Sequence, residues 1–292
     1  MGGLFASRLS EMNDVTIIDL NKDLINKITN EGLVLIEPNG EERTYHFNAR
    51  TTSEGMDKQD LVILFVKAMF SRSALDNNKA IIGDDTFILT MQNGMGHESL
   101  LGEYVDKNHV LLGTTQHNAS VKDLGVNIHG GSGMSYISSM GNNDENVDKI
   151  ATTLTEAGIE CAVSENVKRM IWEKLFTNIS ASVLTGILQK PLGYIYNDPN
   201  AWTICRKLIE EAVCVAKADG YDFDYEEKCN GVKKVCLNSP EGLTSVYSDI
   251  RNGRRTEVDT ISGAVFKKAQ QYGIPVPYTE YSITLIHALE NR

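Results

Sequence analysis

The sequence predicts an α/β protein in which a doubly wound parallel sheet is followed by an all-helical C-terminal domain. Short apolar runs alternate with helical patterns in the first half of the chain. The second half carries long helical patterns over residues 167–188, 201–218 and 256–272, without strand signals. Because 292 residues suit two hydrophobic cores better than one, we expect an α/β domain of residues 1–164 and a helical domain of residues 165–292.

The strands of the first domain are predicted from four apolar runs. Each run is short and continuous, which is typical of parallel strands that are buried on both faces. Helical stretches lie between them, for example over residues 23–30 and 97–105, as in a doubly wound sheet. The four runs are Val15–Ile18, Leu61–Val66, Phe87–Thr90 and Val110–Leu112.

Polar residues follow three of these predicted strands. Asp19, Lys67 and Asn93 each come just after an apolar run. Ligands of doubly wound sheets bind beyond the carboxyl ends of the strands, so the three residues together predict a ligand site. Each residue alone would be weak evidence, because strand ends are often polar simply through exposure.

The first residues read as the start of a helix whose glycine belongs to a dinucleotide-binding motif. Gly2 fits the third glycine of G-x-G-x-x-G, and Asp19, after the next strand, fits the acidic residue that binds the adenosine ribose. The sequence therefore predicts a Rossmann-type domain. We expect its first strand and first two glycines to lie upstream of Met1, which would make the domain N-terminally truncated; the alternative is a complete protein that begins with a helix.

Composition narrows the classes of partner. The formal net charge of −11 argues against nucleic acid, and the basic run Arg251–Arg255 reads as a solvated turn. No apolar run reaches 18 residues and no secretory signal is visible, so we expect no membrane association. A small-molecule partner and a cytoplasmic location fit best. The oligomeric state stays open, with a homodimer among the candidates.

The five cysteines indicate free thiols. Their number is odd and none of them has CxxC spacing, which disfavours a disulfide framework and suits a reducing cytoplasm. No Cys/His cluster has the spacing of zinc ligands, so we expect no metal site.

A polar stripe stands out in the predicted helix over residues 167–188. Lys174, Asn178 and Ser182 are spaced i, i+4 and i+8 and would share one helix face. An ordinary solvated stripe is the alternative, but the surrounding residues are apolar and predict a mostly buried helix. A lysine that is partly desolvated has a lowered pKa, so it can give a proton to the alkoxide left when hydride reduces a ketone.

Several motifs along the whole chain resemble the ketopantoate reductase (2-dehydropantoate 2-reductase) family. The combination of the lysine helix with the segment from Ser245 to Asp259 is specific, whereas the NGMG stretch alone is not. The motifs are Lys67-Ala68, Asn93-Gly94-Met95-Gly96, Trp172-x-Lys174-x-x-x-Asn178, Ser245-x-x-x-Asp249-x-x-x-Gly253-Arg254-Arg255-Thr256-Glu257-x-Asp259 and Gly273-Ile274-Pro275-Val276-Pro277.

The resemblance implies reduction of ketopantoate to pantoate, on the route to pantothenate and coenzyme A, with an NAD(P)H cofactor. It makes Lys174 the general acid and Glu257 its support. Ser182 departs from the family, which commonly has asparagine there, so the substrate pocket is expected to differ. The implied substrate-binding residues are Asn93, Asn178, Ser182 and Ser245, and the implied cofactor-binding residues are Gly2, Asp19, Lys67 and Asn93.

The residues after the second strand bear on the choice of cofactor. The family usually takes NADPH, and many members carry arginine here to meet the 2′-phosphate. This chain has Asp19-Leu20-Asn21-Lys22, and a carboxylate repels phosphate and accepts from a free hydroxyl. Asp19 therefore favours NADH, with Lys22 partly offsetting it.

Two alternatives remain open at the level of sequence. An NAD-dependent dehydrogenase of the same family, acting on a branched or aromatic D-2-hydroxy acid, is favoured by Asp19 and Ser182. A non-catalytic relic of the fold is favoured by the incomplete glycine motif. The intact set of Lys174, Asn178 and Glu257 argues against the relic, since binding alone needs no such combination.

Overall fold

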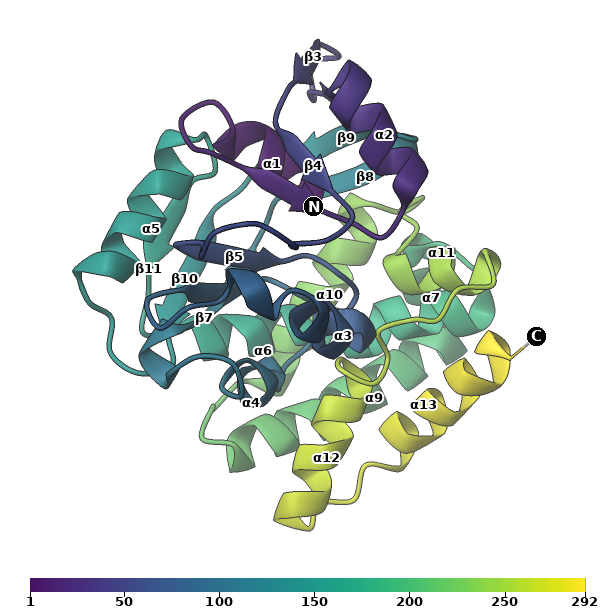
Figure 1. Cartoon of the computed structure of the whole chain (residues 1–292). Helices are drawn as coiled ribbons and strands as arrows, with labels where there is room; N and C mark the ends of the chain where they lie inside the picture. Colours follow the sequence, from purple (N-terminus) through teal and green to yellow (C-terminus); the bar gives the residue numbers. More distant parts are fainter. Residues whose placement is uncertain (292) are drawn as a thin grey trace. The chain divides into compact units, whose positions relative to one another are not determined.

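The computed structural model describes residues 1–291, which form two compact units (Figure 1). The first unit comprises Met1–Gln92 and His97–Val167, and the second comprises Asn93–Gly96 and the chain from Lys168 onward. Residues 93–96 thus belong to the helical unit, although strand and helix of the first unit flank them. The domains expected from the sequence, residues 1–164 and 165–292, do not include this assignment of residues 93–96 to the helical unit.

The main sheet of the first unit has five strands in the order β11-β10-β7-β6-β5. The parallel pairing of β5, β6 and β7 confirms the prediction from the apolar runs. Strand β10 runs antiparallel to β7 and was not predicted. The strands are β5 (Leu61–Leu64), β6 (Phe87–Thr90), β7 (Val110–Thr115), β10 (Ser135–Ser139) and β11 (Cys161–Val163).

Six further strands form two smaller sheets, so the single sheet expected from the sequence is divided. Within residues 1–291, β1 pairs only with β4, and β5 pairs only with β6, so no strand pairing joins β1 to the five-stranded sheet. A mixed four-stranded sheet has the order β3-β2-β9-β8. These strands are β1 (Thr16–Ile18), β2 (Leu33–Ile36), β3 (Glu42–Tyr45), β4 (Asn48–Arg50), β8 (Asn118–Asp123) and β9 (Val126–Gly131).

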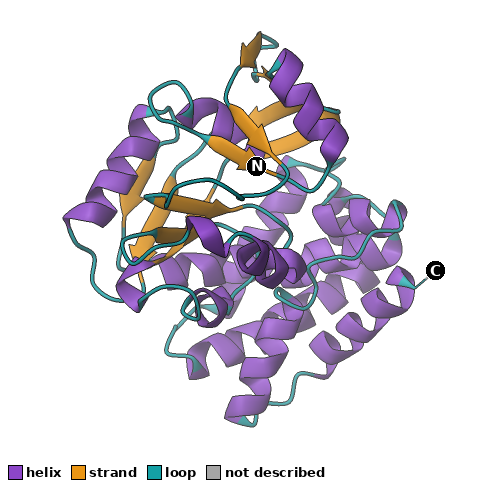
Figure 2. Cartoon of the chain, viewed as in Figure 1, coloured by secondary structure: helices purple, strands orange, loops and turns teal. Residues whose placement is uncertain are grey.

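Helices cover the sheets of the first unit (Figure 2). Leu4 and Phe5 of α1 enter the core, and the Asn21 side chain caps α2 by accepting the backbone N–H groups of Asp23 and Leu24. The helix predicted over residues 97–105 ends early, at Leu101, followed by Gly102. The helices are α1 (Gly2–Leu9), α2 (Lys22–Glu31), α3 (Ser71–Asn77), α4 (His97–Leu101) and α5 (Glu145–Glu156), with short η1 (Ala68–Phe70), η2 (Lys79–Ile81) and η3 (Lys107–His109).

The second unit is helical and packs around α6 and α9. Trp172 and Phe176 of α6 are fully buried against Leu208 and Val215 of α9, so α6 lies in the core of this unit. The predicted spans 167–188 and 201–218 are confirmed as helical. The elements are α6 (Val167–Thr177), the π-helical η4 (Asn178–Ser182), α7 (Val183–Leu188), α8 (Leu192–Asn197), α9 (Pro199–Ala218), α10 (Tyr225–Asn238), α11 (Ser245–Arg251), α12 (Ser262–Tyr272) and α13 (Pro277–Glu290).

The helix predicted over residues 256–272 begins only at Ser262. Residues 256–261 form turns instead, because Thr256 is held outside a helix. Its backbone N–H and hydroxyl both donate to the Glu290 carboxylate, at 2.7 and 2.6 Å, and its hydroxyl accepts the Val258 N–H. This correction matters for Glu257, which lies in a turn and not on a helix.

Helix α6 is fixed by a partly buried polar cluster centred on Asp219, at the end of α9. The indole N–H of Trp172 donates to its carboxylate at 3.0 Å, and Lys268 and Tyr272 of α12 donate at 2.6 and 2.8 Å. Although burial opposes ionisation, these hydrogen bonds hold the pKa of Asp219 below its ordinary value. The cluster ties α6 to α9 and α12.

The described residues bear on two expectations from the sequence, namely the lack of a membrane-spanning helix and the free state of the cysteines. Among residues 1–291, none of the helices combines the length and apolar character needed to cross a bilayer. All five cysteines are free thiols, as predicted, and four of them are buried. The pKa of Cys161 and of Cys205 is raised to about 12 by burial, which keeps both thiols protonated.

The first unit contains a partly buried chain of hydrogen-bonded side chains, from Arg8 to His117. Arg8 donates to Glu37 at 2.6 Å, Glu37 lies 2.9 Å from His129 Nδ1, and His129 Nε2 lies 3.2 Å from His117 Nδ1. The other ring nitrogen of His117 is buried without a hydrogen-bond partner. Burial, then the neighbouring His129 and Arg8, lower the pKa of His117 from its ordinary value.

We expect His117 to make the fold less stable in mild acid. The folded state resists protonating this ring, so its contribution is present above pH 6.5 and is lost as the pH falls below that value. Replacement by glutamine (His117→Gln) should make the melting temperature fall less between pH 7.5 and pH 5.5 than in the parent chain. Thermal denaturation at both pH values checks this, with the exposed His46→Gln as control; equal falls in parent and variant would contradict it.

Candidate active site

Lys174 lies in the last turn of α6, whose apolar face is buried in the helical unit. Its side chain keeps accessible surface, yet surrounding protein desolvates the ammonium group. The side chain is therefore neither fully enclosed nor fully hydrated. Burial lowers the pKa of Lys174, and the charge of Glu257 partly opposes that shift.

Glu257 is brought to Lys174 by the turn over residues 256–261. Its carboxylate accepts a hydrogen bond from the side-chain amide of Asn93, with Nδ2 to Oε2 at 3.3 Å. Asn93 belongs to the same unit as Glu257. Two residues further on, Met95 donates its backbone N–H to the Thr260 carbonyl at 3.0 Å. The structure thus gathers three predicted site residues from separate parts of the sequence.

A π-helical turn follows Lys174 and corrects the predicted polar stripe. Residues 178–182 form η4, whose wider turn breaks the α-helical spacing on which the stripe depended. Ser182 is only 7% exposed, whereas Asn178 is half-buried and Lys174 is open to solvent. Asn178 therefore keeps some exposed surface, whereas Ser182 lies in the interior. Single π-turns within α-helices are rare and frequently occur at functional sites.

Ser245 is the first residue of α11, and its surroundings are set by a residue that the sequence reasoning missed. Thr244 caps α11 by accepting the Tyr247 N–H, and its hydroxyl lies 2.7 Å from that of Thr185. Thr185 in turn donates to the Ser182 carbonyl at 2.7 Å. These bonds join the start of α11 to the π-helical turn. The sequence did contain a signal for this cap, because Thr244 and Ser245 precede the apolar Val246 in a pattern typical of a helix start.

The predicted cofactor residues Gly2, Asp19 and Lys67 lie in the first unit. Asp19 directly follows β1 and is exposed, and one of its oxygens accepts the Asn21 N–H at 2.8 Å. Gly2 opens α1, where a Cβ would lie 3.4 Å from Phe65. A helix start with close backbone packing and a free carboxylate oxygen beyond a parallel strand fit a dinucleotide. Lys67 precedes η1, three residues after β5.

Gln92 is a second residue that sequence reasoning missed. Its side-chain amide donates to the Val66 carbonyl and, at 2.8 Å, to the Ser71 hydroxyl, while its oxygen accepts from Thr90. Gln92 therefore braces the turn that contains Lys67 against the end of β6. No motif in the sequence marks this contact.

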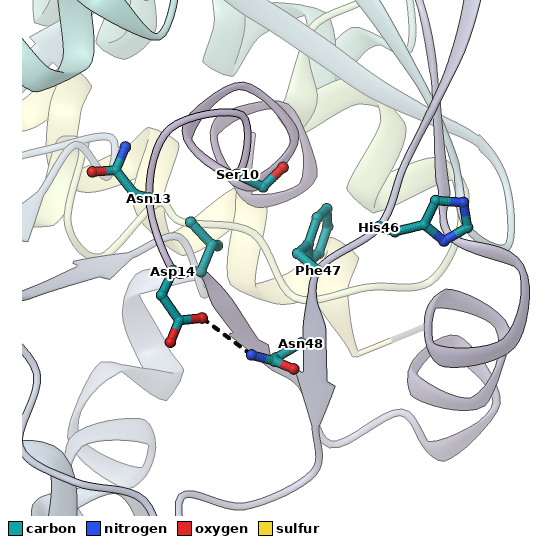
Figure 3. Close-up of a pocket in the computed structure, with 7 residues that line it drawn as sticks. Ser10, Asn13, Asp14, His46, Phe47 and Asn48 are labelled. Atoms are coloured by element: carbon teal, nitrogen blue, oxygen red, sulfur yellow. Dashed lines mark hydrogen bonds between the residues drawn. The ribbon is translucent and has the colours of Figure 1, made fainter.

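A polar hollow of about 400 Å³ lies elsewhere in the first unit (Figure 3). Val15 and Asn48 place it at the amino ends of β1 and β4, the opposite end of β1 from Asp19. Ligands of doubly wound sheets bind at carboxyl ends, so this hollow is distinct from the predicted site. Its lining residues are Ser10, Asn13, Asp14, Val15, His46, Phe47 and Asn48.

A doubly wound α/β unit with an acidic residue beyond its first described strand, and a helical unit that gathers lysine, carboxylate and amide, define a nicotinamide-dependent oxidoreductase. Comparisons with known proteins agree. The family model described as "Ketopantoate reductase PanE/ApbA" matches residues 1–142, and its C-terminal counterpart matches residues 166–290.

Relatives extend over the whole chain. The 2-dehydropantoate 2-reductase of Streptococcus pyogenes serotype M1 is 31% identical over 293 residues, covering 99% of this chain and 95% of the relative. The Lactococcus lactis enzyme of the same name is 31% identical over 297 residues with the same coverage. The chain therefore belongs to the ketopantoate reductase family.

Solved structures show the same fold. A ternary structure of D-mandelate dehydrogenase with NADH and anilino(oxo)acetate is 29% identical with a TM-score of 0.92, covering 100% of this chain and 95% of that one. A candidate 2-dehydropantoate 2-reductase from Enterococcus faecalis is 28% identical with a TM-score of 0.75, at the same coverage.

We expect Thr244→Val to destabilise the helical unit through the lost cap of α11. The valine methyl cannot accept the Tyr247 N–H or bond the Thr185 hydroxyl, so the free energy of unfolding should fall by about 1 kcal/mol. Chemical denaturation measures this. Thr244→Ser keeps the hydroxyl and should retain most of the stability; if valine and serine behave alike, the cap is not the cause.

Proposed function

We propose that this chain reduces a 2-keto acid, ketopantoate to pantoate, with Lys174 as the proton donor. The observation that carries the proposal is the desolvated Lys174 beside the Glu257 carboxylate in the helical unit. Family membership and the named relatives supply the substrate. Pantoate is a precursor of pantothenate and coenzyme A, and the free thiols suit a cytoplasmic enzyme.

The chemistry divides between a bound nicotinamide and this chain's own residues. Reduced nicotinamide supplies the hydride that reaches the carbonyl carbon of the substrate. Lys174 Nζ gives a proton to the carbonyl oxygen, which becomes the hydroxyl of the product, and Lys174 is left as a neutral amine. Because the side chain is open to solvent, it can recover its proton for the next turnover.

The environment of Lys174 suits both halves of that cycle. An unshifted lysine holds its proton too tightly for efficient transfer near neutral pH, and desolvation lowers its pKa. Glu257 opposes this fall and favours the ammonium form, which is the acid. Asn178, on the π-helical turn, and Ser245, at the start of α11, are proposed to bind the polar groups of the substrate.

We expect Lys174→Met to lower kcat for ketopantoate by about 10²–10⁴-fold, because the reaction loses its positioned acid. The KM should change less, since Asn178 and Ser245 remain. Steady-state rates with NADH and with NADPH measure both constants. Lys207→Met, which removes an exposed lysine paired with Glu210, is the matched control and should keep the parent rates. A Lys174 variant as fast as this control would rule the role out.

A second candidate function changes the substrate and keeps the chemistry. The likeness to D-mandelate dehydrogenase favours a branched or aromatic D-2-hydroxy acid dehydrogenase. Comparing kcat/KM for ketopantoate, ketoisovalerate and benzoylformate separates the two. Ketopantoate as the poorest of the three would replace the first candidate with the second.

For the cofactor, we propose NADH. The exposed Asp19 keeps one carboxylate oxygen for the ribose hydroxyls, and its charge would repel the 2′-phosphate of NADPH. Lys22, at the start of α2, opposes this preference only partly. Gly2 and Lys67 are proposed to lie along the rest of the dinucleotide.

Fluorescence titration tests the cofactor proposal. NADH should bind more tightly than NADPH, and Asp19→Asn should narrow the ratio by roughly fivefold, as for a loss of about 1 kcal/mol. Asp14→Asn, at the opposite end of β1, should leave the ratio unchanged. Tighter binding of NADPH by the parent chain would reverse the assignment, and binding of neither cofactor by the folded chain would favour a non-catalytic relic.

A further inference from the structure

The segment Asn93–Gly96 is docked on the turn that carries Glu257. Met95 donates its backbone N–H to the carbonyl of Thr260 at 3.0 Å. Thr260 is itself tied to Glu257, because its backbone N–H and its hydroxyl donate to the Glu257 carbonyl at 3.1 and 3.2 Å. The position of Thr260 is therefore coupled to that of Glu257.

Gly94 makes this docking possible for two separate reasons. Its φ of +94° lies in the left-handed region that side chains rarely adopt. In addition, a Cβ on Gly94 would lie 2.1 Å from the Thr260 carbonyl oxygen and 2.5 Å from its carbon. Both atoms are backbone atoms of the turn, so a side chain could be accepted only by separating the two segments.

Gly96 shares the left-handed backbone conformation of Gly94 but lacks its close contact with Thr260. Its φ of +89° is nearly the same, but a Cβ there would meet nothing within 4 Å. An alanine at Gly96 therefore carries the same kind of backbone strain without pushing on Thr260. The chain contains its own matched control two residues away.

We propose that Gly94 is a positioning residue: its missing side chain seats residues 93–96 on Thr260, so that the Asn93 amide holds the Glu257 carboxylate beside Lys174. The inference rests on the proposed role of Lys174 as the proton donor. It extends that role to a residue that touches no reacting atom and acts only through Asn93 and Glu257.

The chemical consequence follows from the charge of Glu257. In the described part of the chain, Glu257 is the charged group that acts on Lys174 and raises its pKa. The adjacent Glu173 is paired with Lys228 at 2.6 Å. When Glu257 is displaced, the pKa of Lys174 should fall further, so the ammonium form needed for proton donation disappears at a lower pH.

The test compares Gly94→Ala with Gly96→Ala. In Gly94→Ala, the alkaline limb of the kcat profile should move to lower pH by roughly half to one unit, as expected when a charge moves a few ångströms away. The same shift should appear in the pH dependence of Lys174 acylation, followed by mass spectrometry, which needs neither substrate nor cofactor. Gly96→Ala should keep the parent midpoint in both measurements.

Further variants keep the inference testable if Gly94→Ala fails to fold, as judged by circular dichroism. Asn93→Ala removes the amide without touching Thr260 and should lower the midpoint of Lys174 acylation in the same direction. In a folded double variant, the two changes should shift the midpoint no more than one alone. A parent-like midpoint in Gly94→Ala, or in Asn93→Ala if that is the folded variant, overturns the inference.

Failure of the proposed function has a different outcome. If Lys174→Met retains the parent rate, the proton-donor role is lost whatever the glycine variants do. If Lys174→Met is inactive and Gly94→Ala behaves like Gly96→Ala, only the positioning role of Gly94 is lost.

Discussion

The charge of Glu257 acting on Lys174 is the interaction on which the candidate site depends. A lysine enclosed by protein tends to lose its proton, and a carboxylate nearby restrains that loss without abolishing it. The balance requires both groups to be held. Asp219 fixes α6 through Trp172, and the Asn93 amide holds the carboxylate. Core packing therefore serves the site as well as stability.

The turn that carries Glu257 depends in the same way on a distant contact. Glu290, near the end of α13, accepts both the backbone N–H and the hydroxyl of Thr256, and it also lies 2.9 Å from His287. Burial opposes ionisation of the Glu290 carboxyl group. The hydrogen bonds from Thr256 and His287 outweigh this effect and hold its pKa below the ordinary value. The last helix of the described chain thus supports the turn that carries Glu257.

The sequence predicts those parts of the fold in which local pattern and tertiary role agree. The apolar run Phe87–Thr90 matches β6 to the residue, and the helix over 167–188 has its predicted span. Strand β3, Glu42–Tyr45, is mostly charged and polar, so no apolar pattern reveals it. The turn over residues 256–261 replaces a helix because Glu290, 34 residues away, captures Thr256. The π-turn likewise has no periodic signature.

The placement of residues 93–96 has a consequence for the gene as well as for the protein. The polypeptide passes between the units after Gln92, after Gly96 and after Val167, so the helical unit is not one contiguous stretch of sequence. Cutting or recombining the coding sequence near residue 167 would separate Asn93 and Gly94 from the turn at Glu257–Thr260. Grafting the helical unit onto another chain would therefore require residues 93–96 as well as the chain from Lys168 onward.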